Sequence, residues 1–212
     1  MHKTLYRRNL PHWHPINQSF FLTWRLAGSL PESVISELQA IRQQLKRKRS
    51  VLTPEGRVAE YKKLLAKVDR ILDKAETGPL WLATPEIAAM IQTTLLQTYS
   101  SLYRLWAYVL MANHVHVLLK PKLHFSVELI MQRLKGYTAL EANRILGQTG
   151  ETFWQDESFD HWPRDQDEFF RIVDYIENNP VKAALVDRPE DWIWSSAAER
   201  KRRGWTRFRA LT

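Results

Sequence analysis

The sequence predicts an α+β protein, a single domain over residues 1–212 in which helices pack on an antiparallel sheet. Aromatic and β-branched residues gather in short segments at 19–26, 103–110 and 114–120, which is typical of strands. The last two segments are separated only by residues 111–113, so they predict a β-hairpin that places the second of them near the middle of the sheet. Elsewhere apolar residues recur every three to four positions, which indicates helices with one buried face.

Two of these helices form a charged pair near the start of the chain. Residues 31–45 and 58–72 repeat apolar positions at helical spacing on either side of the turn signal T-P-E-G at 53–56. We therefore predict a helical hairpin over 31–77, inserted into the domain. Its basic run K-R-K-R at 46–49 is as typical of a solvated helix end as of a DNA contact.

The remaining predicted helices have capping or stop signals at their ends. Thr84 and Pro85 give a cap followed by proline at the first helical position, and Gly147 gives a stop. Asp165 and Glu168 have the spacing of an acidic capping box, and the helix that they open is expected to end before Pro180. The predicted helices are 84–100, 125–147 and 165–179.

Composition narrows the classes of function. The chain has no cysteine, so disulfides and thiolate metal sites are excluded. No apolar run approaches the roughly 20 residues of a membrane helix, and the first residues lack the apolar core of a signal peptide. We therefore expect a cytoplasmic, bacterial, nucleoid-associated protein. A net charge of +8 favours a polyanionic partner, although from charge alone nucleic acid is no more than an even chance.

The segment M-A-N-H-V-H-V-L-L-K at 111–120 raises the question of chemistry, because it sets two imidazoles in a strand that is otherwise apolar. Alternate strand residues share a face, so His114 and His116 lie together. Such a pair can coordinate a divalent metal if a third ligand comes from elsewhere. Alternatively, the two histidines can be structural, hydrogen-bonded beneath a helix. On the last helix Tyr175 and Asn179 are four apart and hence on one side, one turn from each other.

The combination of these blocks resembles a known family. N-H-V-H-V-L-L at 113–119 and D-Y-I-E-N-N-P-V-K at 174–182 are similar to the REP-associated tyrosine transposases, relatives of the single-tyrosine HUH transposases of insertion sequences. The resemblance covers most of residues 6–30 and 78–197. Further blocks that share it are Y-R-R at 6–8, F-F-L-T-W-R-L at 20–26, F-W-Q-D-E-S-F-D-H-W at 153–162 and W-I-W-S-S-A at 192–197.

The resemblance implies an HUH transposase core and a catalytic or metal-binding role for particular residues. His114, His116 and Asn179 would bind Mg²⁺ or Mn²⁺, and Tyr175 would attack a DNA phosphodiester to give a 5′-phosphotyrosine. The implied enzyme cleaves and rejoins single-stranded DNA at REP-like hairpin palindromes, as a monomer or homodimer. Tyr137 is the rival nucleophile, although it lacks an amide four residues on.

The sequence offers only candidates for the DNA contacts, and it is compatible with two alternative functions. Five basic side chains are candidate DNA contacts: Arg7, Arg8, Lys135, Arg164 and Lys182. One alternative function is a domesticated module that binds hairpin DNA without cutting it. The other is a zinc hydrolase built on the His pair, in which Asp174 or Glu177 would replace Asn179 as the third ligand.

Overall fold

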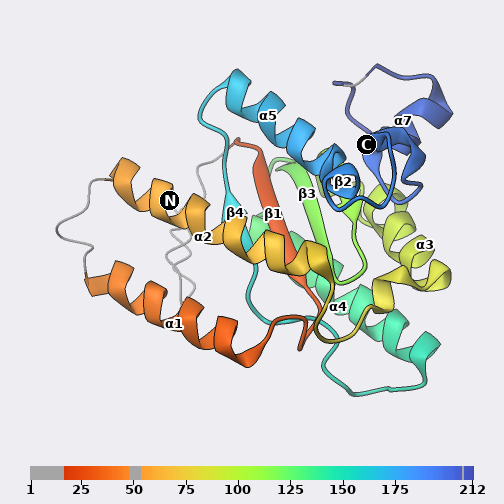
Figure 1. Cartoon of the computed structure of the whole chain (residues 1–212). Coiled ribbons are helices and arrows are strands. Elements are labelled where there is room, and N and C mark those ends of the chain that lie inside the picture. The colour runs from red at the N-terminus through yellow and green to blue at the C-terminus, as the bar shows by residue number, and fades with distance from the viewer. Residues whose placement is uncertain (1–16, 48–53, 207) are drawn as a thin grey trace.

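The computed structural model describes residues 17–47, 54–206 and 208–212 and shows helices on both faces of a small sheet (Figure 1). The strands are β1 (Phe20–Arg25), β2 (Tyr103–Leu110), β3 (His114–Pro121) and β4 (Phe159–His161). The helices are α1 (Glu32–Arg47), α2 (Pro54–Lys74), α3 (Pro85–Thr93), α4 (Val127–Leu146), α5 (Gln166–Glu177), α6 (Asn179–Lys182) and α7 (Ser196–Arg203). Among these residues no helix is long and apolar enough to cross a membrane.

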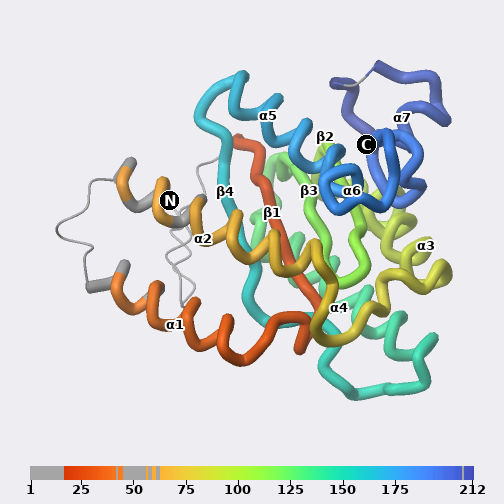
Figure 2. The backbone as a smooth tube through the Cα atoms, in the orientation of Figure 1, coloured from red at the N-terminus to blue at the C-terminus, as the bar shows by residue number. Residues whose placement is uncertain are grey.

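The sheet is antiparallel throughout, with strand order β2-β3-β1-β4 (Figure 2). The strand that carries the two histidines is therefore an inner strand, as predicted. His116 lies opposite Thr23 of β1, and His114 lies opposite Arg25. The short strand β4 was not predicted, because its three residues follow a run of polar and acidic residues that gives no alternating pattern.

The two faces of the sheet are covered by different helices. On one face Val115, Val117 and Leu119 join a core completed by apolar residues of α3 and α4. On the other face Leu118 joins a second core with residues of α2 and α5. Figure 1 shows α2 crossing in front of β1 and β3 while α4 lies behind them. The predicted α+β class is confirmed, and α5, the helix of Tyr175, packs on β3.

The predicted hairpin exists as α1 and α2, and its two ends meet. Gly78 has a φ of 77°, and a Cβ placed on it would lie 2.2 Å from the carbonyl oxygen of Gly28. Only a glycine permits so close an approach. The chain thus leaves the sheet after β1 and returns to the same point, which is the geometry that an inserted hairpin requires.

Three helix ends test the predictions. The side chain of Asp165 accepts a hydrogen bond from the Glu168 amide, so the predicted cap forms. Gly147 ends α4 with a φ of 67°. The helix with Tyr175 stops earlier than predicted, at Glu177, and Asn179 is the first residue of the short helix α6. Pro180 explains the break, since it lacks the N–H that would continue the hydrogen-bond ladder.

Candidate active site

The two histidines lie side by side on the face of the sheet that α2 and α5 cover. Their ring centroids are 4.8 Å apart, and both side chains are completely buried. The strand period thus brings them together as the sequence predicted.

Polar neighbours fix the orientation of both rings. The Asn113 amide nitrogen donates to the carbonyl of Leu72 at 3.1 Å, which leaves its oxygen to accept from Nδ1 of His114 at 2.7 Å. Nδ1 of His116 lies 2.7 Å from the hydroxyl of Thr23. Because the Asn113 oxygen can only accept, Nδ1 of His114 carries the proton and its Nε2 carries the lone pair, which is the arrangement that metal-binding histidines adopt.

Burial also keeps both rings neutral. Desolvation lowers the pKa of His114 to about 3. It lowers the pKa of His116 as well, with smaller contributions from His114 and Lys182. A neutral imidazole is the form that coordinates a cation, so no proton has to be removed near neutral pH.

Asn179 reaches the same place from α6. Its side chain is completely buried, and its amide nitrogen lies 3.4 Å from Nε2 of His116. Its side-chain oxygen has no hydrogen-bond partner among the described residues. The break in the helix before Pro180 therefore does not separate Asn179 from the His pair.

Tyr175 completes the predicted group. Its ring packs edge-on against His116 at 5.7 Å and against Phe21 at 5.9 Å. The ammonium group of Lys182 lies 4.9 Å from the centre of the Tyr175 ring. The Tyr175 hydroxyl donates a hydrogen bond to the carboxylate of Asp69.

Two acidic residues of α2 belong to this site and were missed in the sequence. Asp69 and Asp73 are one helical turn apart, and Oδ1 of Asp73 lies 3.6 Å from Nε2 of His114. Burial raises the pKa of Asp69 to about 7 and that of Asp73 to about 6. The available signal was position: each acid directly follows an apolar residue of the buried stripe, Val68 or Leu72.

The donor set fits a divalent cation held by imidazole and amide groups. Within the described residues, no three His, Asp, Glu or Cys side chains are close enough to form a metal site, so the set depends on the amide of Asn179. Nonetheless, several buried polar atoms here have no hydrogen-bond partner in the described part of the chain: Nε2 of His114, Oδ1 of Asn179, Oδ1 of Asp69 and Oδ1 of Asp73. Unpaired buried polar atoms are costly, and a cation held by His114 and Asn179 would satisfy Nε2 of the first and Oδ1 of the second.

Two of the alternative residues lie elsewhere. Tyr137 is on α4, behind the sheet, where its ring packs against Tyr99. Glu177, one of the two alternative third ligands, accepts from Arg200 and from the Ser196 hydroxyl.

The predicted nucleophile is not acidified by its surroundings. Burial together with the charge and hydrogen bond of Asp69 raises the pKa of Tyr175.

The predicted DNA contacts do not all lie at the candidate site. Lys182 stands beside Tyr175. Lys135 lies on α4 and donates to the carbonyls of Gln155 and Asp156, at 2.6 and 3.0 Å. Arg7, Arg8 and the side chains of the basic run 46–49 lie outside the described part of the chain.

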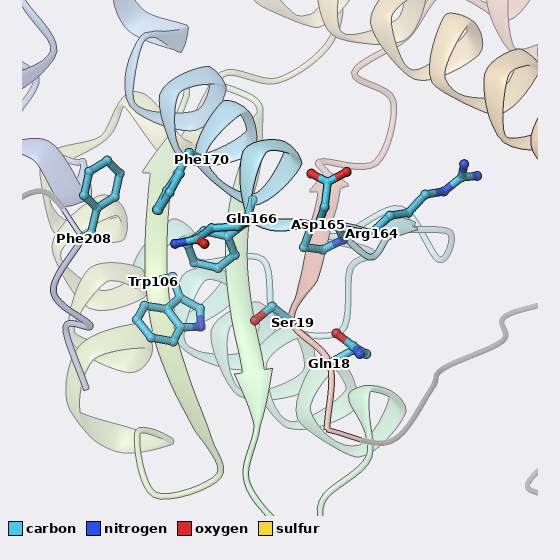
Figure 3. Close-up of a pocket in the computed structure, with 10 residues that line it drawn as sticks. Gln18, Ser19, Trp106, Arg164, Asp165, Gln166, Phe170 and Phe208 are labelled. Carbon is cyan, nitrogen blue, oxygen red and sulfur yellow. The ribbon is translucent and has the colours of Figure 1, made fainter.

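Arg164 borders a cavity of about 480 Å³ at the start of α5. Figure 3 shows Trp106, Phe170 and Phe208 on one side of it, and the Arg164 side chain pointing away from those rings. The structure therefore does not bring Arg164 to the His pair.

A family model matches part of the chain. Residues 84–179 match the family described as "Transposase IS200 like", a segment that includes both histidines, Tyr175 and Asn179 and leaves out the hairpin. No curated protein matches the chain.

Two solved structures match the chain, and the first of them shares its fold. The structure of a REP-associated tyrosine transposase bound to a REP hairpin is 16% identical, with 96% of this chain and 88% of that chain covered and a TM-score of 0.50. A protein of Deinococcus radiodurans R1 described as a transposase is 14% identical, with 80% and 96% covered and a TM-score of 0.31. The family match over residues 84–179 and the shared fold support the resemblance seen in the sequence: that segment is similar to the IS200-like transposases, and the chain has the fold of a REP-associated tyrosine transposase.

Proposed function

We propose that the protein is a metal-dependent transposase or endonuclease that cleaves and rejoins single-stranded DNA through a 5′-phosphotyrosine. One observation carries this proposal. A tyrosine hydroxyl, two neutral imidazoles and an amide oxygen lie together on one face of the sheet, although they come from β3, α5 and α6. A purely structural histidine pair would not need an amide oxygen left without a partner.

His114, His116 and Asn179 are the residues that would hold the cation. Mixed nitrogen and oxygen ligands without thiolate suit Mn²⁺ or Mg²⁺, Mn²⁺ better. When bound, the cation would polarise the scissile phosphate and neutralise charge in the transition state. Asn113 accepts from Nδ1 of His114 and so keeps the Nε2 atom of that ring available for it.

The proton of Tyr175 leaves during the attack. Attack forms a bond between the Tyr175 oxygen and phosphorus and breaks the bond from phosphorus to the 3′-oxygen, which then takes a proton from water. In the closed site the Tyr175 hydroxyl donates to the carboxylate of Asp69, whose pKa is raised to about 7. Because Asp69 lies on α2, which must move to admit DNA, the phenol proton would pass to water.

The site as folded is closed to DNA. His114, His116 and Asn179 have no exposed surface. Helix α2 contacts the site through Asp69, Asp73 and the carbonyl of Leu72. A phosphate can therefore reach the histidines only after α2 moves away from them.

The proposed substrate is single-stranded DNA next to a REP-like hairpin. The similar solved structure holds a REP hairpin, and this chain has a net charge of +8. Lys182 is placed to contact a phosphate near Tyr175. Binding should therefore weaken steeply as salt rises.

The test is formation of a covalent adduct. The protein is incubated with single-stranded palindromic DNA and Mn²⁺ or Mg²⁺, and the DNA-linked peptide is identified by mass spectrometry. We expect an adduct that survives denaturation, needs the cation and maps to Tyr175. Binding of hairpin DNA with no adduct under any of these conditions would instead favour the non-cleaving binding module. An adduct on another residue would reject the proposed nucleophile.

A further inference from the structure

We infer that the cavity at the start of α5 is a second DNA site, which holds one unpaired base of the strand whose phosphate reaches Tyr175. The inference rests on the proposed function for the class of ligand, single-stranded DNA. The volume of the cavity is about 480 Å³. Pockets that enclose small organic ligands range from about 300 to 1,000 Å³, so a base fits this one.

The walls of the cavity carry aromatic rings. Those of Trp106 and Phe169 meet edge-on, with centroids 5.4 Å apart. Those of Phe170 and Phe208 are 4.3 Å apart, and Phe208 is 48% exposed. Every DNA base has a π-face, and unpaired bases stack on aromatic side chains of this kind. The ring of Phe208 has surface left on which a base can stack.

Polar side chains complete the lining. Gln18 and Ser19 directly precede β1, and Gln166 is the first residue of α5. Figure 3 shows Gln18 and Ser19 across the cavity from Phe208. An amide both donates and accepts hydrogen bonds, as the edges of the bases do. The lining thus offers stacking and hydrogen bonding together, the two contacts by which proteins hold bases that are splayed out of a strand.

The charges at the rim suit a base inside the cavity and a phosphate outside it. The carboxylate of Asp165 accepts from the Glu168 amide at 2.7 Å, so it is engaged by the protein. The Arg164 side chain points away from the rings (Figure 3). A base is neutral and its phosphate is anionic. A guanidinium directed out of the cavity is therefore placed for the backbone of a strand whose base lies inside.

The cavity and Tyr175 share helix α5. Phe170 precedes Tyr175 by five residues, roughly 8 Å along the helix axis. That length is roughly two or three nucleotide steps at about 3.4 Å per step. None of the residues that line the cavity belongs to α2, which covers the histidines. A strand can therefore be held by its base before α2 moves and admits the phosphate.

The first experiment measures the affinity of the full chain for single-stranded hairpin DNA by fluorescence anisotropy, in buffer with EDTA. Phe208→Ala removes an exposed ring, and we expect the affinity to fall about 5-fold to 100-fold, the effect of one stacked base. Phe208→Tyr keeps the ring and should bind as the wild type does. Phe125→Ala is the matched control, because Phe125 is also exposed and does not line the cavity. Equal affinity of Phe208→Ala and the wild type would overturn the inference, as would an equal loss in Phe125→Ala.

The second experiment identifies the base. 2-Aminopurine, a fluorescent base whose emission falls when it stacks, replaces each unpaired base of the DNA in turn. We expect one position beside the hairpin to be quenched by the wild type and by Phe208→Tyr, but not by Phe208→Ala. Quenching that is the same for all three chains at every position would reject the cavity as the site of the base.

These readouts need neither a cation nor cleavage, so they separate the inference from the proposed function. An adduct at Tyr175 together with unchanged binding by Phe208→Ala would reject the inference and leave the proposed function standing. Weaker binding by Phe208→Ala without any adduct would reject cleavage and keep the base site. Circular dichroism melting of each variant excludes unfolding as the cause of a lost affinity.

Discussion

The two faces of strand β3 are equally buried and chemically opposite. Val115, Val117 and Leu119 on one face, and His114 and His116 on the other, have no exposed surface. The apolar face packs against apolar residues of α3 and α4. The histidine face instead meets four polar side chains from three helices, Asp69, Asp73, Tyr175 and Asn179.

The difference teaches that burial alone does not distinguish packing from function in this molecule. On the apolar face burial stabilises the fold through the hydrophobic effect. On the histidine face it leaves nitrogen and oxygen atoms without partners, which costs stability. A protein retains such a cost where the atoms serve another purpose, so substitutions on the two faces should affect different measurements.

The largest effect is expected from Tyr175→Phe. The change removes only the oxygen that we propose as the nucleophile and keeps the ring that packs on His116 and Phe21. Adduct formation should fall below detection, a loss of at least about 10³-fold, or about 4 kcal/mol in the activation barrier. Gel analysis of denatured protein–DNA adducts measures it. Tyr137→Phe, behind the sheet, is the control and should form adduct normally; the reverse result would assign the nucleophile to α4.

On the apolar face Leu119→Ala should act on stability alone. It removes a completely buried side chain from the core formed with α3 and α4, which costs about 2–5 kcal/mol of unfolding free energy. Urea unfolding measures this loss. Adduct formed per folded molecule should stay within about twofold of the wild type. A large loss of cleavage in the folded variant would show that the two faces are not independent.

Much of this fold could be predicted because its signals are local. The strand period placed His114 and His116 on one face, and Asp165 caps its helix as expected. The break between Tyr175 and Asn179 was missed because both residues fit one helical period until Pro180 interrupts it. Asp69 and Asp73 were missed because their contact with the site depends on how α2 docks on the sheet, which no local pattern encodes.

A third prediction concerns how the stability contributed by the histidine face of β3 depends on pH. Burial raises the pKa of Asp69 from 3.8 to about 7 in the folded protein. The folded state therefore opposes ionisation of Asp69, and this group's contribution to stability is full below about pH 4 and declines as the pH rises to about 7. Asp69→Asn removes the decline. We compare the free energy of unfolding of the variant with that of the wild type in metal-free buffer. This difference should be more favourable to the variant at about pH 8 than at about pH 4.5, by on the order of 1–4 kcal/mol.

Urea unfolding at the two pH values measures this change. Glu60→Gln, an acid on the surface of the same helix, is the control and should show no such pH dependence. A constant difference between Asp69→Asn and the wild type at both pH values would mean that Asp69 ionises in the folded protein as readily as in the unfolded chain.

The smallest effects should come from two lysines that lie on opposite sides of the sheet. Lys182 stands over the Tyr175 ring, where a phosphate would lie, whereas Lys135 is bound to the carbonyls of Gln155 and Asp156. Lys182→Ala should weaken single-strand binding and reduce the slope of log affinity against log salt by about 0.7, the value for one phosphate contact. Lys135→Ala should leave that slope unchanged and lower stability instead, because two carbonyls lose their donor. Fluorescence anisotropy across a salt series measures both slopes. If Lys135→Ala reduced the slope as much as Lys182→Ala, DNA would have to contact α4 as well, and the division of roles between the two faces would not hold for binding.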